Sequence, residues 1–220
     1  MATMTEKLLI DFASLLEGHS YIKGKDGQQV MTLEGLFSKA EVVNGNNRTY
    51  PAPILKRAID LLMPKVNERS VTGELGHPAD RIESLPQLES HLISSLRWDD
   101  GSKEVWGLLE VLNYGPGSMG YLLEQRILHK VKTGISSRAT GSTEPTEVSG
   151  VVQVCEDLRV ATYDIVTDPS NPGSWVGLKE ARLYEQVLAE SRKQVGNLTM
   201  DVNFKKALFE YFDILNGKRY

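Results

Sequence analysis

The sequence has a single cysteine, Cys155, among its 220 residues, so no disulfide can form within the chain. A lone cysteine of this kind is usually a small core side chain, and it suits a reducing cytoplasm. No apolar run approaches the roughly 20 residues that a membrane-spanning helix needs. Residues 1–16 lack the basic segment that precedes the apolar part of a signal peptide. We therefore expect a cytoplasmic protein that does not bind membranes.

An excess of positive charge is absent as well. The chain has 25 Lys and Arg against 29 Asp and Glu, which gives a formal net charge of −4. Proteins that bind nucleic acids in general present a basic face. The sequence therefore predicts no nucleic-acid partner.

The motifs of common metal and nucleotide sites are missing too. There is no His-Glu-x-x-His, no cysteine pair and no Gly-x-x-x-x-Gly-Lys phosphate loop. Glu74-x-x-His77 matches half of a di-metal carboxylate motif, which requires a helix and a second copy. Gly73, Gly76 and Pro78 oppose a helix at this place. We therefore predict neither a metal nor another cofactor.

What the sequence does contain is a mixture of strand-like and helix-like segments. Apolar residues at helical spacing predict helices over 51–69 and 118–132. The strand-like stretches 92–98 and 104–112 flank a hairpin turn, Asp99-Asp100-Gly101-Ser102, and a further strand is expected over 151–166. This mixture indicates an α+β fold with a partly closed, barrel-like sheet and surrounding helices.

The composition changes after Trp175, where charged and helix-prone residues become frequent. We interpret this part of the chain as a helical C-terminal tail. The predicted division is an N-terminal segment over 1–30, a domain that carries the chemistry over 31–177, and the tail over 178–220.

Among the histidines, His77 has the surroundings expected of a working side chain. In Gly73-Glu74-Leu75-Gly76-His77-Pro78 the glycines allow a sharp backbone path, and Pro78 fixes the next φ. The alternative is an ordinary turn histidine. His129 is expected on the surface at a helix end, and His91 is expected to pack where a strand begins.

A second candidate is Ser136, in Gly134-Ile135-Ser136-Ser137-Arg138-Ala139-Thr140-Gly141. A serine flanked by glycines is expected on a tight turn, with its hydroxyl exposed. Nearby backbone N–H groups can then form an oxyanion hole, and Arg138 adds positive charge. The alternative is a serine-rich turn or an anion-binding loop.

The third candidate, Asp164, lies in the apolar stretch Tyr163-Asp164-Ile165-Val166. A carboxylate in such a stretch costs free energy unless a partner pairs with it. A histidine N–H is one partner, and it would fix the tautomer that leaves the other ring nitrogen free as a base. A structural salt bridge is the alternative, and the residues alone leave both open.

Taken together, these segments resemble the prohead core protein proteases of T-even-type tailed phages. The resemblance implies a serine endopeptidase inside the immature capsid, in the host cytoplasm. The implied fold is the barrel-like one shared by phage prohead proteases and herpesvirus assemblins. The matching stretches occur in family order over about residues 35–175: Ala40-Glu41-Val42-Val43-Asn44, Asn47-Arg48-x-Tyr50-Pro51, residues 73–78, Gly115-Pro116-Gly117, Gly134-Ile135-Ser136-Ser137-Arg138 and residues 164–175.

The same resemblance assigns the catalytic histidine to His77, the nucleophile to Ser136 and the third member to Asp164. His77 would take the Ser136 proton, while backbone N–H groups near Ser137 and Arg138 hold the oxyanion. The choice of Ser136 over Ser137 comes from the resemblance alone.

The resemblance also implies substrates and a specificity. The expected substrates are scaffold or core proteins and the major capsid protein, cut after Leu or Ile, any residue, then Glu. Matching sequences near both chain ends predict self-cleavage after Glu17, Glu185 and Glu190, although Leu-x-Glu is also common in amphipathic helices. Self-association of the chain is left open.

Two other functions remain open from the residues. The first is a non-catalytic scaffold or capsid-assembly protein. The second, more distant, is an esterase that uses the same residues, because Gly134-Ile135-Ser136 loosely matches the start of a nucleophile elbow.

Overall fold

The computed structural model describes residues 21–23, 29–78 and 80–178, which all belong to one compact unit, Glu17–Lys179. Eight strands form the main sheet, and three short strands form a second sheet. The main strands are β1 (Tyr21–Lys23), β2 (Gln29–Lys39), β4 (Thr72–Glu74), β5 (Glu89–Asp99), β6 (Glu104–Val111), β7 (Thr133–Thr140), β10 (Arg159–Val166) and β11 (Trp175–Leu178). The small sheet consists of β3 (Arg48–Thr49), β8 (Thr143–Pro145) and β9 (Val152–Val154).

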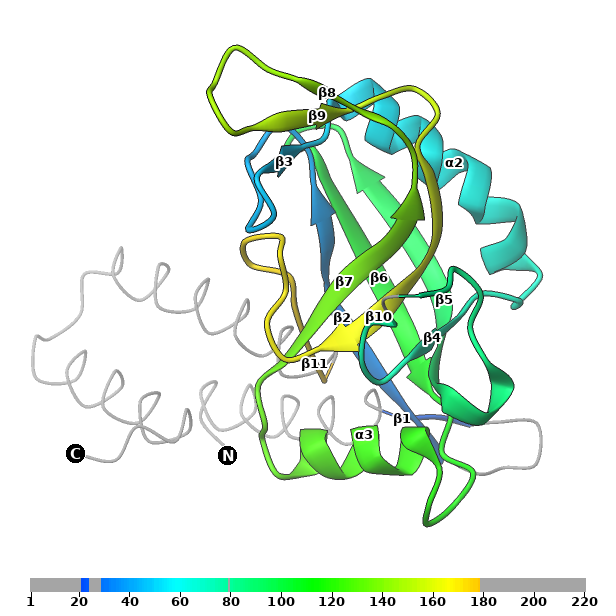
Figure 1. Ribbon diagram of the computed structural model, residues 1–220. Coiled ribbons are helices and arrows are strands. Elements are labelled where there is room, and N and C mark those ends of the chain that lie inside the picture. The colour runs from blue at the N-terminus through cyan, green and yellow to red at the C-terminus, as the bar shows by residue number, and fades with distance from the viewer. Residues whose placement is uncertain (1–20, 24–28, 79, 179–220) are drawn as a thin grey trace, which may run out of the picture. The chain divides into compact units, whose positions relative to one another are not determined.

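The main sheet runs in the order β10-β7-β11-β2-β6-β5-β4, with β1 paired to β2, and these pairs are antiparallel (Figure 1). Register shifts interrupt β2, β5 and β10. Bulges of this kind increase the local twist and bend a sheet, which helps it to close on itself. The sheet is therefore curved into a barrel whose two edge strands are β4 and β10.

The two edges meet without forming a full ladder. Leu75 makes a parallel bridge with Ile165, and the Gly76 N–H donates to the Ile165 carbonyl at 2.9 Å. A second contact joins β5 to β10. The Nε2 atom of buried His91 on β5 lies 2.9 Å from the Tyr163 carbonyl oxygen on β10. We call this line of contacts between β4, β5 and β10 the seam. The barrel is nearly closed along it.

Gly73 allows β4 to lie close to β10 and to His91 of β5. A Cβ atom at this position would lie 2.1 Å from the Tyr163 carbonyl oxygen and 2.4 Å from His91 Nε2. Only a residue without a side chain fits there, so the glycine predicted to permit a sharp path in fact permits a close approach.

Aromatic and aliphatic side chains fill the barrel. The rings of Phe37 and Tyr163 lie 4.9 Å apart at a tilted angle of 56°. The buried Tyr163 hydroxyl lies 3.1 Å from Ser38 Oγ, which satisfies its hydrogen-bonding capacity. Burial raises the pKa of Tyr163 above its ordinary value. The core thus extends across the barrel from β2 to β10.

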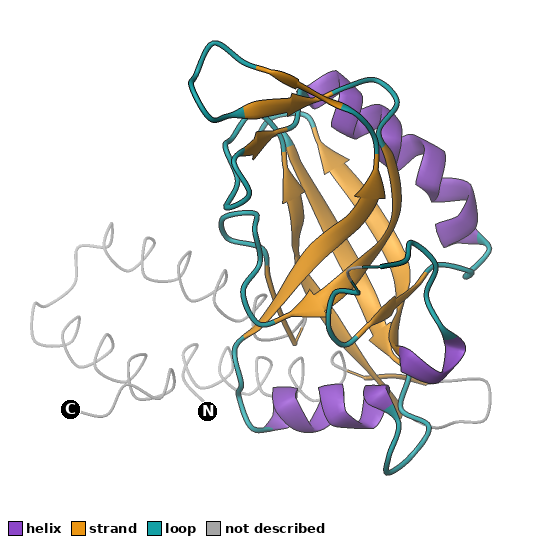
Figure 2. Ribbon diagram, in the orientation of Figure 1, coloured by secondary structure: helices purple, strands orange, loops and turns teal. Residues whose placement is uncertain are grey.

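Two α-helices cover this barrel (Figure 2). The first, α2 (Ala52–Asn67), buries Leu55, Ile59 and Leu62 at helical spacing and packs against β5 and β10. The second, α3 (Met119–Leu128), begins at Ser118, whose hydroxyl accepts from the Tyr121 N–H at 3.1 Å. It packs against β5 and β6. A 3₁₀ turn, η1 (Pro86–Leu88), precedes β5.

The predicted barrel-like sheet is confirmed, and the described part of the chain is mostly sheet with these two α-helices. The helices expected over 51–69 and 118–132 and the hairpin around 99–102 are present. The stretch 151–166 forms two strands, β9 and β10, instead of one.

The expectation of a tight turn at Ser136 is wrong. This serine lies within the regular strand β7. The local sequence is small and polar, and the partners that make it a strand lie far away in the chain, on β10 and β11.

Some predictions fall outside the described residues. These include the tail after Leu178 and the three self-cleavage sites, so the predicted domain division stays a prediction. No described helix is long and apolar enough to cross a membrane.

Candidate active site

The seam brings His77 to Asp164. Gly76 has a φ of 107°, in the left-handed region that glycine tolerates. Its N–H is tied to β10, so the chain leaves β4 and turns His77 back over that strand. His77 Nδ1 then lies 2.8 Å from Asp164 Oδ2. Because the carboxylate accepts, Nδ1 carries the proton, and Nε2 is left free as a base.

Asp164 is completely buried, and its carboxylate accepts four hydrogen bonds from three residues. Besides His77, the Glu74 N–H donates to Oδ1 at 3.0 Å, and Arg138 donates to both carboxylate oxygens, at 2.6 and 2.9 Å. Burial alone would raise the pKa of Asp164. The bonds from His77, Arg138 and Glu74 outweigh burial and lower the pKa below its ordinary value. Asp164 is therefore an anion that orients His77.

The Arg138 side chain is held in place by Asp164 and by two backbone carbonyls. This side chain is buried, and Nη1 donates to the carbonyls of Ile82 and Glu83 at 3.1 and 2.9 Å. The sequence left open whether Asp164 pairs with a histidine or in a salt bridge, and it does both. The Arg138 side chain therefore fixes the position of Asp164.

A second buried carboxylate, Glu74, extends the network. It accepts from the Leu85 N–H at 2.8 Å and pairs with Arg81. Two buried carboxylates, Asp164 and Glu74, are thus balanced by two arginines, Arg81 and Arg138. The two buried carboxylates therefore have cationic partners within the network itself.

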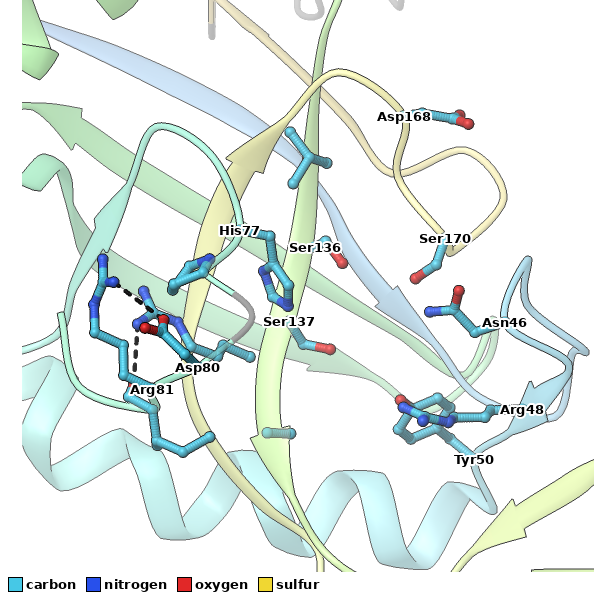
Figure 3. A pocket seen from close by; sticks show the side chains of 15 residues that line it. Asn46, Arg48, Tyr50, His77, Asp80, Arg81, Ser136, Ser137, Asp168 and Ser170 are labelled. Atoms are coloured by element: carbon cyan, nitrogen blue, oxygen red, sulfur yellow. Dashed lines mark hydrogen bonds and ion pairs between the residues drawn. The ribbon is translucent and has the colours of Figure 1, made fainter. Parts of the chain in front are cut away.

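The strand β7 carries the two candidate serines next to this pair. Ser136 lies directly opposite Asp164 in the register, and Ser137 lies opposite Tyr163. Residues opposite each other in adjacent strands share a face of the sheet. Ser136 therefore shares its face with the Asp164 carboxylate, to which His77 is bonded. Figure 3 shows the His77 ring turned toward the stretch of β7 that carries both serines.

One edge of β7 is open at these serines. The Ile135 N–H donates to the Ser174 carbonyl at 3.0 Å, on the side of β7 where β11 pairs. Because N–H groups alternate along a strand, the Ser137 N–H points to the same side. The pairing of β11 with β7 ends at Gly134, so within the described residues no strand pairs with β7 on this side at Ser137, which lines the pocket. The same alternation turns the Arg138 N–H toward β10.

The serines, His77 and the seam line a pocket of about 620 Å³. One wall includes His77, Asp80 and Arg81, and the other is formed by two segments, one with Asn46, Arg48 and Tyr50 and one with Asp168 and Ser170 (Figure 3). The Gly45 N–H donates to the Ser170 carbonyl at 2.6 Å, which ties these two segments together. A pocket of this size, open to solvent, can admit a segment of polypeptide.

Within the described residues, no group of three or more His, Cys, Asp and Glu side chains is arranged to hold a metal ion. The other two histidines that the structure describes do not line the pocket. His91 is buried in the seam, and His129 is exposed at the C-terminal end of α3.

A histidine hydrogen-bonded to a buried carboxylate, next to serines in an open pocket, is the arrangement of serine hydrolases. The sequence model of one protein family, described as "Prohead core protein serine protease", matches residues 1–185. The chain belongs to this family and is therefore a protease.

Two individual proteins support this assignment. The chain is 32% identical over 206 residues to the prohead core protein protease of Enterobacteria phage T4, which covers 91% of this chain and 92% of that protein. The solved structure of the bacteriophage T4 capsid assembly protease has a TM-score of 0.62 at 28% identity. That match covers 68% of this chain and 90% of the other.

The sequence interpretation missed two members of the buried network, Glu74 and Arg81. Glu74 belongs to the family-like stretch 73–78 and to half of a metal motif, but neither pattern indicates that its carboxylate is buried. No local pattern marked Arg81, because its partners are set by the path of residues 76–85.

Proposed function

We propose that this protein is a serine endopeptidase that matures a phage capsid from inside the prohead, in the host cytoplasm. Its substrates would be scaffold or core proteins and the major capsid protein. The observation that carries the catalytic part is the hydrogen bond from His77 to buried Asp164 on the face of the sheet that holds Ser136. Membership in the prohead protease family supports the biological role.

In the proposed mechanism, Asp164 holds the His77 ring so that Nε2 accepts the proton of the Ser136 hydroxyl. The Ser136 oxygen attacks the substrate carbonyl carbon, and the Ser137 N–H stabilises the resulting oxyanion. His77 then returns the proton to the leaving amine, and water hydrolyses the acyl-enzyme by the same steps in reverse order. The Arg138 side chain contributes by fixing Asp164.

The proposed specificity is Leu or Ile, any residue, then Glu before the cut. It includes self-cleavage after Glu17, Glu185 and Glu190, which would keep the predicted domain 31–177 whole and remove most of the predicted helical tail. Neither nucleic acid nor a cofactor has a part in this proposal.

The experiment that tests this proposal is intact mass spectrometry of the wild-type, Ser136→Ala and Ser137→Ala proteins over several hours at neutral pH. We expect the wild type and Ser137→Ala to lose terminal segments, and Ser136→Ala to stay whole. Labelling with a fluorophosphonate, followed by peptide mapping, should modify Ser136 in the wild type. Circular dichroism checks that the alanine variants fold.

The outcomes separate the alternatives. If Ser137→Ala stays whole while Ser136→Ala is processed, the nucleophile assignment is wrong. If the wild type neither cleaves itself nor reacts with the fluorophosphonate, the catalytic proposal fails, and the non-catalytic scaffold role is favoured.

A further inference from the structure

Three arginines line the pocket within the described residues, and two of them are occupied. Arg138 is bound to Asp164, and Arg81 pairs with Glu74 and Asp80. The third, Arg48, is exposed to solvent on the opposite wall. Throughout the described part of the chain, no hydrogen bond or ion pair engages its guanidinium group. Arg48 is therefore free to bind a group that enters the pocket.

The backbone of Arg48 is fixed although its side chain is free. The Oδ1 atom of buried Asn44 accepts from the Arg48 N–H at 3.0 Å, and the Asn44 N–H donates to the Arg48 carbonyl at 2.9 Å. Arg48 also pairs with Val152 in the small sheet. The Arg48 guanidinium group therefore extends from a fixed backbone position and has no partner among the described residues, so less ordering is needed when it binds an anion.

The acidic residues of the pocket lie elsewhere. Asp80 lies on the other wall beside Arg81, 3.4 Å from its Nη1. Asp168 is exposed, and Figure 3 shows it far from Arg48 along the wall that both share. Positive charge therefore dominates the end of the pocket that Arg48 occupies.

We propose that Arg48 is the specificity-determining residue that binds the acidic side chain of the substrate. This inference rests on the proposed function and assigns a protein partner to the Glu of the Leu/Ile-x-Glu sequence. A guanidinium group binds a carboxylate with two parallel hydrogen bonds, which an uncharged amide of the same shape cannot match. Arg48 would bind the side chain of the residue before the cut, and it takes no part in the proton transfers of the chemical step.

The test compares paired peptides that differ in one functional group. A peptide library digested by the wild-type enzyme first identifies the best-cut sequence by mass spectrometry. That peptide and its Glu→Gln counterpart are then assayed with wild type, Arg48→Gln, Arg48→Lys and Arg48→Glu. Arg97→Gln is the matched control, because Arg97 is an exposed arginine of β5 outside the pocket.

In the wild type and in Arg97→Gln, we expect kcat/KM to favour the Glu peptide by about 10- to 100-fold, as for a charged hydrogen bond. Arg48→Gln should reduce this preference to about threefold or less, because the charged hydrogen bond is lost, and the Glu peptide should lose much more activity than the Gln peptide. Arg48→Lys should keep part of the preference. Arg48→Glu should shift the cleavage sites in the library toward Lys or Arg.

Each contrary result has a separate meaning. If Arg48→Gln keeps the wild-type preference for Glu, or loses both peptides equally, the inference is wrong and the protease function stands. If the wild-type enzyme cuts no peptide of the library, the proposed function itself fails, and the inference fails with it.

Discussion

Asp164 binds His77 and Arg138 at once, and this dual role decides its charge. Burial would favour the protonated acid, but the hydrogen bonds from His77, Arg138 and the Glu74 N–H lower the pKa below the ordinary 3.8. Because the pKa of Asp164 is lower in the folded protein than in the unfolded chain, its ionised form stabilises the fold at any pH above the ordinary pKa. This contribution is lost only as the pH falls through the lowered pKa of the folded protein. Loss of stability above pH 4 must therefore come from another group.

Within the described residues, His91 is a group of this kind. Complete burial is the main cause that lowers its pKa from 6.5 to about 4, although the Tyr163 carbonyl and Asp164 act in the opposite direction. Between these two values the unfolded chain binds a proton that the folded protein excludes. Stability must therefore fall as the pH is lowered through this window.

We predict that the free energy of unfolding of the wild type falls by roughly 2 kcal/mol between pH 7 and pH 5 because of His91. His91→Gln should remove most of this dependence, since a carboxamide can still donate to the Tyr163 carbonyl but cannot be protonated. Urea unfolding at the two pH values measures the effect. The control, His129→Gln, changes an exposed histidine and should keep the wild-type dependence. A His91→Gln protein as sensitive to acid as the wild type would contradict the prediction.

At the scale of secondary-structure elements, β4 has only three residues but controls the site. The Glu74 N–H and the Gly76 N–H, at and just beyond its end, both donate to β10. His77 follows directly, so its position depends on how closely β4 approaches that strand. Gly73 sets this approach because any Cβ would collide with Tyr163 and His91.

We therefore predict that Gly73→Ala lowers stability by about 1–3 kcal/mol, the usual cost of overpacking, and kcat by more than about tenfold. The kcat falls because the shift of β4 moves His77 away from Asp164. Urea unfolding and peptide hydrolysis measure the two effects.

The matched control for this prediction is Gly177→Ala on β11, where an added Cβ meets no atom within 4 Å. It should change stability by about 0.5 kcal/mol or less. Full activity in a destabilised Gly73→Ala protein would separate β4 from the site and refute the argument.

These elements differ in how far the sequence could predict them. The helix α2 and the hairpin of β5 and β6 were predictable because their apolar spacing and turn residues lie within one short window. The strand β7 was not, because Ile135 is its only large apolar side chain, and its pairing is with distant strands.

The candidate site was predicted in part for the same reason. Glycine and proline around His77 are local signals, and a carboxylate within an apolar strand required a partner. The pairing of that carboxylate with both His77 and Arg138 depends on the closure of the barrel, which no local pattern specifies.

At the scale of the whole molecule, the hydrogen bonds of the candidate site join residues 74–85 to residues 138–164, all within the unit Glu17–Lys179. The predicted cuts after Glu17, Glu185 and Glu190 fall at or beyond the ends of that unit. Other Leu-x-Glu sequences lie inside it, at 108–110 in β6 and at 122–124 in α3, where Leu109 and Leu123 are fully buried. Because a protease requires an extended and accessible segment, these internal sequences should resist cleavage.

We therefore predict that self-cleavage shortens the chain at its ends and leaves an active barrel. Mass spectrometry and peptide hydrolysis, followed over the same hours, should show new termini at 17, 185 or 190 while activity persists. The variant with both Glu185→Gln and Glu190→Gln should keep its tail longer than the wild type and still cut an added peptide. Glu124→Gln, which removes an internal match, should leave the pattern unchanged. Early cuts at Glu110 or Glu124 would contradict the protection of the internal sequences. Loss of activity together with the tail would mean that the terminal segments belong to the working enzyme.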